Sequence, residues 1–172
     1  PIGLLTVIAA KAAGASKIFV MDLSETRLAK AKELGATHII NSGKVNPVEE
    51  IKKVVPNGVD VAFEIAGVAP TFKQAIDSTK ARGTMVIVSI FARPIEWHPL
   101  QLTNTGVKIT SSIAYTPTSF QQTIDLMGTG SLKPQSIVTS IIELDDIVEK
   151  GFEALTNDKS QAKILVKLSG EK

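Results

Sequence analysis

The chain has 172 residues, of which 44% are hydrophobic and 21% are charged; its formal net charge is +2 and it contains no cysteine. This length accommodates one domain with a core, or one domain with an appended segment, and excludes two full domains. The absence of cysteine excludes disulfides and cysteine-ligated zinc within this segment. Lys and Glu alternate along the chain without a basic stripe, which argues against nucleic acid as a partner. No apolar run approaches the ~20 residues of a membrane span. We therefore expect a cytoplasmic protein that binds neither nucleic acid nor a membrane.

The first part of the chain alternates helices and strands at short intervals. A helix is predicted over 4–13 and is ended by Gly14. Ser24 is a candidate N-cap for a second helix, which Gly35 stops. The other predicted elements, in chain order, are a strand over 17–21, a strand over 38–40, a helix from about Pro47, a strand over 60–65, a helix carrying Phe72, Ala75, Ile76 and Thr79, a strand over 83–90 and an outer strand over 107–113.

This alternation predicts an α/β fold with a doubly wound parallel sheet. The run 85–88 is apolar at every position, as is typical of a strand that helices cover on both faces. Beyond Tyr115 the rhythm changes, so we expect the later elements to pack elsewhere. These are a helix over 119–127, a strand over 137–142, a capped helix over 145–155 and a final strand over 163–168.

The spacing between Gly3 and Asp22 is the most informative feature of the chain. Asp22 ends the first predicted strand 19 residues after Gly3, which is where a Rossmann-type βαβ unit places the acid that binds the adenosine ribose. Ile2 and Gly3 begin the first helix, whose N-terminal amides and dipole attract a pyrophosphate. The acid disfavours the extra phosphate of NADP and Leu23 follows it instead of an arginine, so NAD is the expected cofactor. The alternatives to these cofactor roles are that Gly3 is an ordinary helix-start glycine and that Asp22 is a solvated acid at a strand end.

Further cofactor-binding candidates lie beside Asp22 and at the ends of later strands. Arg27 could lie along the ribose or a phosphate, and a plain surface arginine is the alternative. Open α/β sheets bind ligands at the carboxyl ends of their strands. We therefore expect one strand end to border the adenosine and the next to border the nicotinamide; their residues are Ile65, Ala66 and Gly67, and Ser89, Ile90 and Phe91.

The dinucleotide fingerprint is seen only from its third glycine onward. The strand that precedes Gly3 in such a unit, and the two earlier glycines, are not among the 172 residues. In the usual strand order 3-2-1-4-5-6 that strand is central. We therefore expect the isolated chain to be unstable, with a vacant position between the strands over 17–21 and 60–65.

Taken together, the ordered segments resemble the C-terminal part of medium-chain, zinc-dependent alcohol dehydrogenases, and most closely the polyol and butanediol branch. No single segment is specific, whereas their ordered combination covers nearly the whole chain. The matching segments are 1–4, 11–15, 20–22, 29–36, 58–61, 63–67, 151–155 and 163–166.

The resemblance implies the cofactor-binding part of an enzyme that oxidises a small secondary alcohol or diol with NAD, a sorbitol or threonine dehydrogenase parent being the alternative. It assigns residues 1–114 to an incomplete NAD-binding Rossmann domain and 115–172 to a segment that returns to a catalytic domain. The parent's zinc ligands and proton relay would lie outside this chain, so we expect no catalytic residue and no metal ligand here, and no activity of the isolated chain. It also implies a homo-oligomer that pairs through the edge strand 107–113. The alternative from another class is a non-catalytic nucleotide-binding or interaction fragment.

Overall fold

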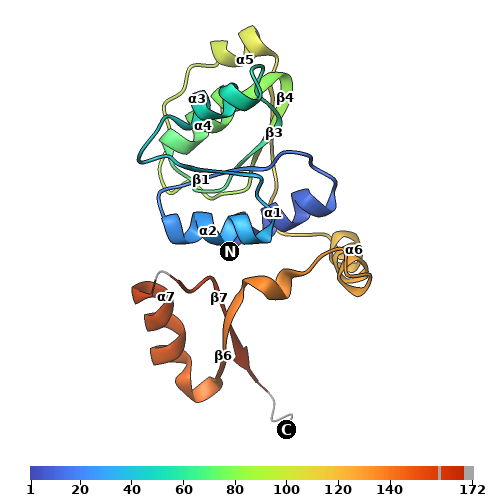
Figure 1. The fold of residues 1–172 in the computed structure, drawn as a ribbon, viewed down its shortest axis with the longest axis vertical. Coiled ribbons are helices and arrows are strands. Elements are labelled where there is room, and N and C mark those ends of the chain that lie inside the picture. The colour runs from blue at the N-terminus through green and yellow to red at the C-terminus, as the bar shows by residue number, and fades with distance from the viewer. Residues whose placement is uncertain (159, 169–172) are drawn as a thin grey trace. The chain divides into compact units, whose positions relative to one another are not determined.

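The structure is a computed structural model that describes residues 1–158 and 160–168 (Figure 1). Helices and strands alternate along the chain, as the sequence predicts. Their order is α1 (Ile2–Ala12), β1 (Phe19–Asp22), α2 (Glu25–Leu34), β2 (His38–Asn41), α3 (Pro47–Val54), β3 (Val59–Glu64), α4 (Ala69–Ser78), β4 (Thr79–Ile87), α5 (Leu100–Thr105), β5 (Lys108–Ser111), α6 (Pro117–Gly128), β6 (Val138–Glu143), α7 (Ala154–Asn157) and β7 (Lys163–Lys167).

The strands form three hydrogen-bonded sheets, with the orders β1-β2, β3-β4-β5 and β6-β7. The pairs β3–β4, β4–β5 and β6–β7 are parallel, which confirms the predicted α/β class with parallel strands. The strands β1 and β3, which the predicted order places on either side of the absent strand, belong to separate sheets.

The chain divides into two compact units, which are residues 1–39 with the described part of 117–172, and residues 40–116. The predicted division at residue 114 stays a prediction. Among the described residues, no helix combines the length and apolar character needed to cross a membrane.

Local side-chain chemistry sets the ends of the first helices. Gly14 adopts a φ of 84° directly after the helical turn that ends α1, and Gly35 a φ of 123° at the end of α2. The Ser24 hydroxyl accepts a hydrogen bond from the Arg27 N–H at 3.4 Å and caps α2 as predicted. Asn46 caps α3 in the same way, with Pro47 at the first helical position.

The core of the first unit lies between α1, α2 and the residue that precedes β1. Small side chains allow close packing there, since Ala31 is fully buried and Ala36 is 3% exposed. Val7 of α1 and Ile18 complete the cluster, so the first βα segment has an apolar interior of its own.

The core of the second unit lies between α4 and the sheet β3-β4-β5. Met85 of β4 is fully buried there, and the Phe72 ring of α4 packs edge-on against Trp97 at a centroid distance of 5.6 Å. The opposite face of the sheet is not covered within this unit, because Val61 and Phe63 of β3 are 46% and 43% exposed.

Two predicted elements differ from the structure. The helix expected over 145–155 is divided into a 3₁₀ turn (Leu144–Asp146), a π-helix (Ile147–Glu153) and α7. A Cβ added at Gly151 would lie 3.3 Å from the Ile142 side chain, so the wide π turns occur where the backbone closely approaches β6. In the second case Thr79 begins β4 and does not extend α4.

Candidate functional site

Asp22 is the last residue of β1, and its carboxylate is held at the strand end by local contacts. Its Oδ1 atom accepts a hydrogen bond from the Ser24 N–H at 2.8 Å and lies 3.2 Å from Arg27 Nη2. The Asp22 side chain is 28% exposed and that of Arg27 is 63% exposed. Since Ser24 also caps α2, the turn from β1 into α2 orients a carboxylate and a guanidinium that a ligand in solution can reach.

The other predicted residues of the first unit are exposed. Ile2 is 52% exposed and Leu23 is 70% exposed. A Cβ added at Gly3 would meet no atom within 4 Å. The close helix–strand packing that the third glycine of the fingerprint normally permits is therefore not found at Gly3 among the described residues.

In the second unit, the structure brings the two predicted strand-end groups, residues 65–67 and 89–91, into contact. Gly67 has a φ of 75°, and a Cβ added there would lie 2.7 Å from the Ile90 carbonyl oxygen. Only glycine accepts both this backbone conformation and this approach without strain. Ala66 and Ile90 are exposed beside this contact, whereas Ile65 and Ser89 are half-buried.

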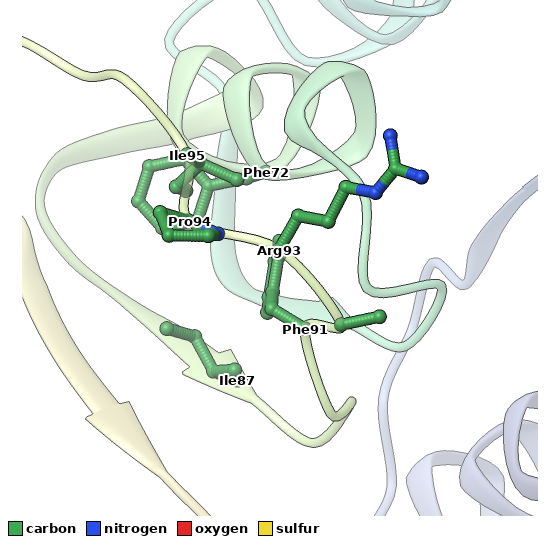
Figure 2. A pocket seen from close by; sticks show the side chains of 7 residues that line it. Phe72, Ile87, Phe91, Arg93, Pro94 and Ile95 are labelled. Atoms are coloured by element: carbon green, nitrogen blue, oxygen red, sulfur yellow. The ribbon is translucent and has the colours of Figure 1, made fainter.

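Phe91 turns toward α4. Its ring packs edge-on against Phe72 at a centroid distance of 6.3 Å. Phe91 lines a hollow of about 480 Å³. Figure 2 shows the Arg93 side chain directed away from the other labelled side chains. The lining is otherwise apolar and consists of Phe72, Ile87, Phe91, Ala92, Pro94 and Ile95, so this hollow offers no acid or base for catalysis.

Sequence reasoning missed Glu64, the last residue of β3. It is 1% exposed, and its Oε1 atom accepts hydrogen bonds from the Ala66 and Gly67 N–H groups, both at 2.9 Å, and from the Thr71 hydroxyl at 2.6 Å. The Ser89 hydroxyl donates to Oε2. The available signal was an acid directly after the apolar run 61–63, since buried acids require hydrogen-bonding partners.

Neither histidine belongs to a metal site in the described part of the chain, where no group of three or more His, Asp and Glu side chains could hold an ion. The His38 ring stacks on Phe19 at 4.5 Å, and His98 Nδ1 accepts a hydrogen bond from the Leu100 N–H at 3.1 Å. With no cysteine in the chain, the described residues do not fit a zinc ion, and we assign no chemical step to one.

Comparison with known proteins gives consistent matches over this chain. The sequence profile of a family described as "Zinc-binding dehydrogenase" matches residues 1–129. The (R,R)-butanediol dehydrogenase of Bacillus subtilis is 43% identical over 167 residues, which make up 97% of this chain and 48% of that protein. The sorbitol dehydrogenase of the same organism is 33% identical over 168 residues, or 96% of this chain and 47% of that protein.

Solved structures of the same family also match this chain. The crystal structure of 2R,3R-butanediol dehydrogenase from Bacillus subtilis matches with a TM-score of 0.92 and 43% identity, over 98% of this chain and 48% of that one. A zinc-binding dehydrogenase from Sinorhizobium meliloti, solved with bound NADP, matches with a TM-score of 0.86 and 31% identity, over 97% of this chain and 49% of that one. The chain thus spans about half the length of the relatives it matches.

Proposed function

This chain belongs to the zinc-binding dehydrogenase family, and from that premise we propose that it is the NAD-binding part of an alcohol dehydrogenase that oxidises a small secondary alcohol or diol. The observation that carries the proposal is the reachable Asp22 carboxylate at the end of β1, held by the Ser24 amide. The 43% identity to a butanediol dehydrogenase favours a diol as the substrate. Other relatives are named as sorbitol and L-threonine dehydrogenases, and we place these two substrates second.

Asp22 would bind the adenosine ribose. A carboxylate accepts hydrogen bonds from both ribose hydroxyls of NAD and repels the additional phosphate of NADP. Arg27, 3.2 Å away, offsets part of that negative charge. We therefore propose a preference for NAD on the order of tenfold, about 1.4 kcal/mol, and not an absolute discrimination.

The remaining predicted residues would contact other parts of the cofactor. Ile2 and Gly3 begin α1, an 11-residue helix whose first amides suit a pyrophosphate. The segments 65–67 and 89–91 follow the carboxyl ends of the parallel strands β3 and β4, where α/β sheets bind ligands. When bound, NAD supplies the hydride acceptor. This chain's residues bind and orient it, and we assign none of them a proton-transfer role.

The first experiment titrates NAD⁺ and NADH into the 172-residue chain. We expect Asp22→Ala to weaken NAD binding about tenfold or more and to reduce the preference over NADP, because the ribose hydroxyls lose their acceptor. Asp60→Ala is the matched control, since Asp60 is an exposed acid at the other end of a strand, with its side chain 84% exposed. Unchanged affinity in Asp22→Ala would contradict the proposed ribose site.

The second experiment tests the catalytic assignment. We expect the chain alone to show no turnover with zinc, NAD and 2,3-butanediol, because the described residues contain no metal-binding cluster. A chimera in which this chain replaces the matching half of the Bacillus subtilis butanediol dehydrogenase should oxidise the diol with NAD. Turnover by the chain alone would contradict our placement of the catalytic groups. NADH binding with an inactive, folded chimera would favour a non-catalytic nucleotide-binding role.

We also propose that two copies pair through β5. This strand is at the edge of the sheet β3-β4-β5, so one row of its backbone groups can accept a further strand. Sedimentation velocity measures the oligomeric state, and Ile109→Pro should reduce the dimer because proline removes a backbone N–H within the edge strand. A monomer at all concentrations would contradict the pairing.

A further inference from the structure

We propose that Glu64 is a positioning residue for the cofactor: its buried carboxylate joins the loop after β3 to the end of β4 and so holds two backbone segments together. The segments are Ala66–Gly67 and Ser89–Ile90, here called the strand-end wall. The inference rests on the proposed function, in which the cofactor contacts this wall.

The geometry places Glu64 at the junction of the two segments. On one side, its Oε1 atom accepts the N–H groups of Ala66 and Gly67 at 2.9 Å each. On the other side, the Ser89 hydroxyl donates to Oε2. The backbone of Glu64 adds a second link, because its carbonyl oxygen accepts the N–H groups of Val88 at 2.9 Å and Ser89 at 3.3 Å.

The chemistry of the side chain suits this task. An ionised carboxylate is acceptor-only and offers about four lone-pair positions. The groups that surround Glu64 are donors: the Ala66 and Gly67 amides and the Thr71 and Ser89 hydroxyls. At 1% exposure, water cannot replace the carboxylate as their acceptor. The carboxylate therefore fixes the loop through satisfied hydrogen bonds and is itself too deeply buried to touch a ligand.

The two segments are also in direct contact. A Cβ added at Gly67 would lie 2.7 Å from the Ile90 carbonyl oxygen and 3.5 Å from the Ser89 Cβ. Such closely packed atoms move together, so releasing one segment from Glu64 displaces the other. The exposed Ala66 and the 87% exposed Ile90 are the parts of the wall that a ligand can reach.

Two hydroxyl deletions provide a matched pair. Ser89→Ala and Thr71→Val each remove one hydroxyl donor to the same carboxylate, but Thr71 lies on α4, outside the wall. The measurements are the NADH dissociation constant, the unfolding midpoint, and hydrogen exchange at the Ala66 and Gly67 amides. We expect Ser89→Ala to weaken NADH binding about five- to tenfold and to speed exchange at both amides, and Thr71→Val to change the dissociation constant less than about twofold.

Glu64 variants separate positioning from direct contact. In Glu64→Gln, the amide oxygen can still accept from the loop and the NH₂ group can donate to the Ser89 hydroxyl, so we expect NADH affinity within about threefold of the original chain. Glu64→Ala should lose about tenfold or more, with no further loss on adding Ser89→Ala, because both changes break one link.

Each outcome decides the matter. Additive losses in Glu64→Ala with Ser89→Ala, or weaker binding in Ser89→Ala with unchanged exchange at Gly67, would mean that Ser89 acts on cofactor binding independently of Glu64, and would overturn the inference. If Glu64→Ala does not fold, the Ser89→Ala exchange result and the Glu64→Gln affinity still decide. Failure of the unsubstituted chain to bind NADH would instead contradict the proposed function.

Discussion

The ends of β1 and β3 carry the same chemical group in two different environments. Asp22 and Glu64 are each the last residue of a strand, and each accepts the N–H of the residue two positions later, Ser24 and Ala66 respectively. The Asp22 side chain is 28% exposed and faces a guanidinium, whereas Glu64 is 1% exposed and is surrounded by hydrogen-bond donors. Exposure thus decides whether a strand-end carboxylate can meet a ligand or can only shape the loop.

The energetic consequences differ in the same way. A partly exposed ion pair gains little stability, because water already solvates both charges well. A buried carboxylate is stable only while its donors are in place, and removing it leaves those donors without partners. Substitutions at Asp22 should therefore change ligand affinity with little change in stability. Substitutions at Glu64 should change loop geometry and stability, and ligand affinity only through the loop.

The largest expected effect is at Glu64. Glu64→Leu should lower the free energy of unfolding by about 2–4 kcal/mol, because the Ala66 and Gly67 amides and the Ser89 hydroxyl lose their acceptor. Glu64→Gln should stay within about 1 kcal/mol, since it retains an acceptor of nearly the same size. Urea unfolding followed by the fluorescence of Trp97, the single tryptophan of the chain, measures both. Equal losses in the two variants would mean that hydrogen bonding is not what Glu64 contributes.

A pair of glycine substitutions gives the next largest effect. Gly67→Ala should cost about 1–3 kcal/mol of unfolding free energy, because it combines a positive φ with a 2.7 Å approach to the Ile90 carbonyl oxygen. Gly3→Ala should be neutral or stabilise by up to about 1 kcal/mol, since the position is helical and open. Thermal unfolding followed by circular dichroism checks both. A tolerated Gly67→Ala would show that the strand-end wall can move.

Asp22→Ala should change stability much less than Glu64→Leu does. Its partner Arg27 is 63% exposed, so we expect a loss below about 1 kcal/mol that shrinks further in 1 M salt. The measurement is the same urea unfolding at low and high salt. A salt-independent loss as large as that of Glu64→Leu would remove the contrast between the two strand ends.

The smallest effect concerns Asp60, a third carboxylate, at the beginning of β3. The Lys80 ammonium hydrogen-bonds it and lowers the pKa of Asp60 below its ordinary value of 3.8. Because the folded pKa is depressed, the contribution to stability is present above the ordinary pKa and is lost as the pH falls through the folded pKa. Asp60→Asn should slightly reduce the loss of stability between about pH 5 and pH 3, as seen in urea midpoints. An increased loss would contradict this sign.

The sequence alone determined the elements whose ends depend on neighbouring residues. Gly14, Ser24 and Gly35 act through backbone conformation and hydrogen bonds within one helical turn, so their roles are readable from local spacing. The family resemblance, which depends on ordered segments along the whole chain, was confirmed by comparison. The position of Asp22 at a strand end was also predicted correctly, while its contact with NAD stays a prediction.

Only the tertiary structure decided the role of Glu64, the contact of Gly67 with Ile90 and the π turns around Gly151. The donor from Ser89 comes from 25 residues farther along the chain, and it reaches Glu64 because β3 and β4 are adjacent parallel strands. Local propensity and periodicity describe interactions over a few residues. Whether an acid is buried, and which distant groups surround it, depends on which strands pair, and that is a property of the folded chain.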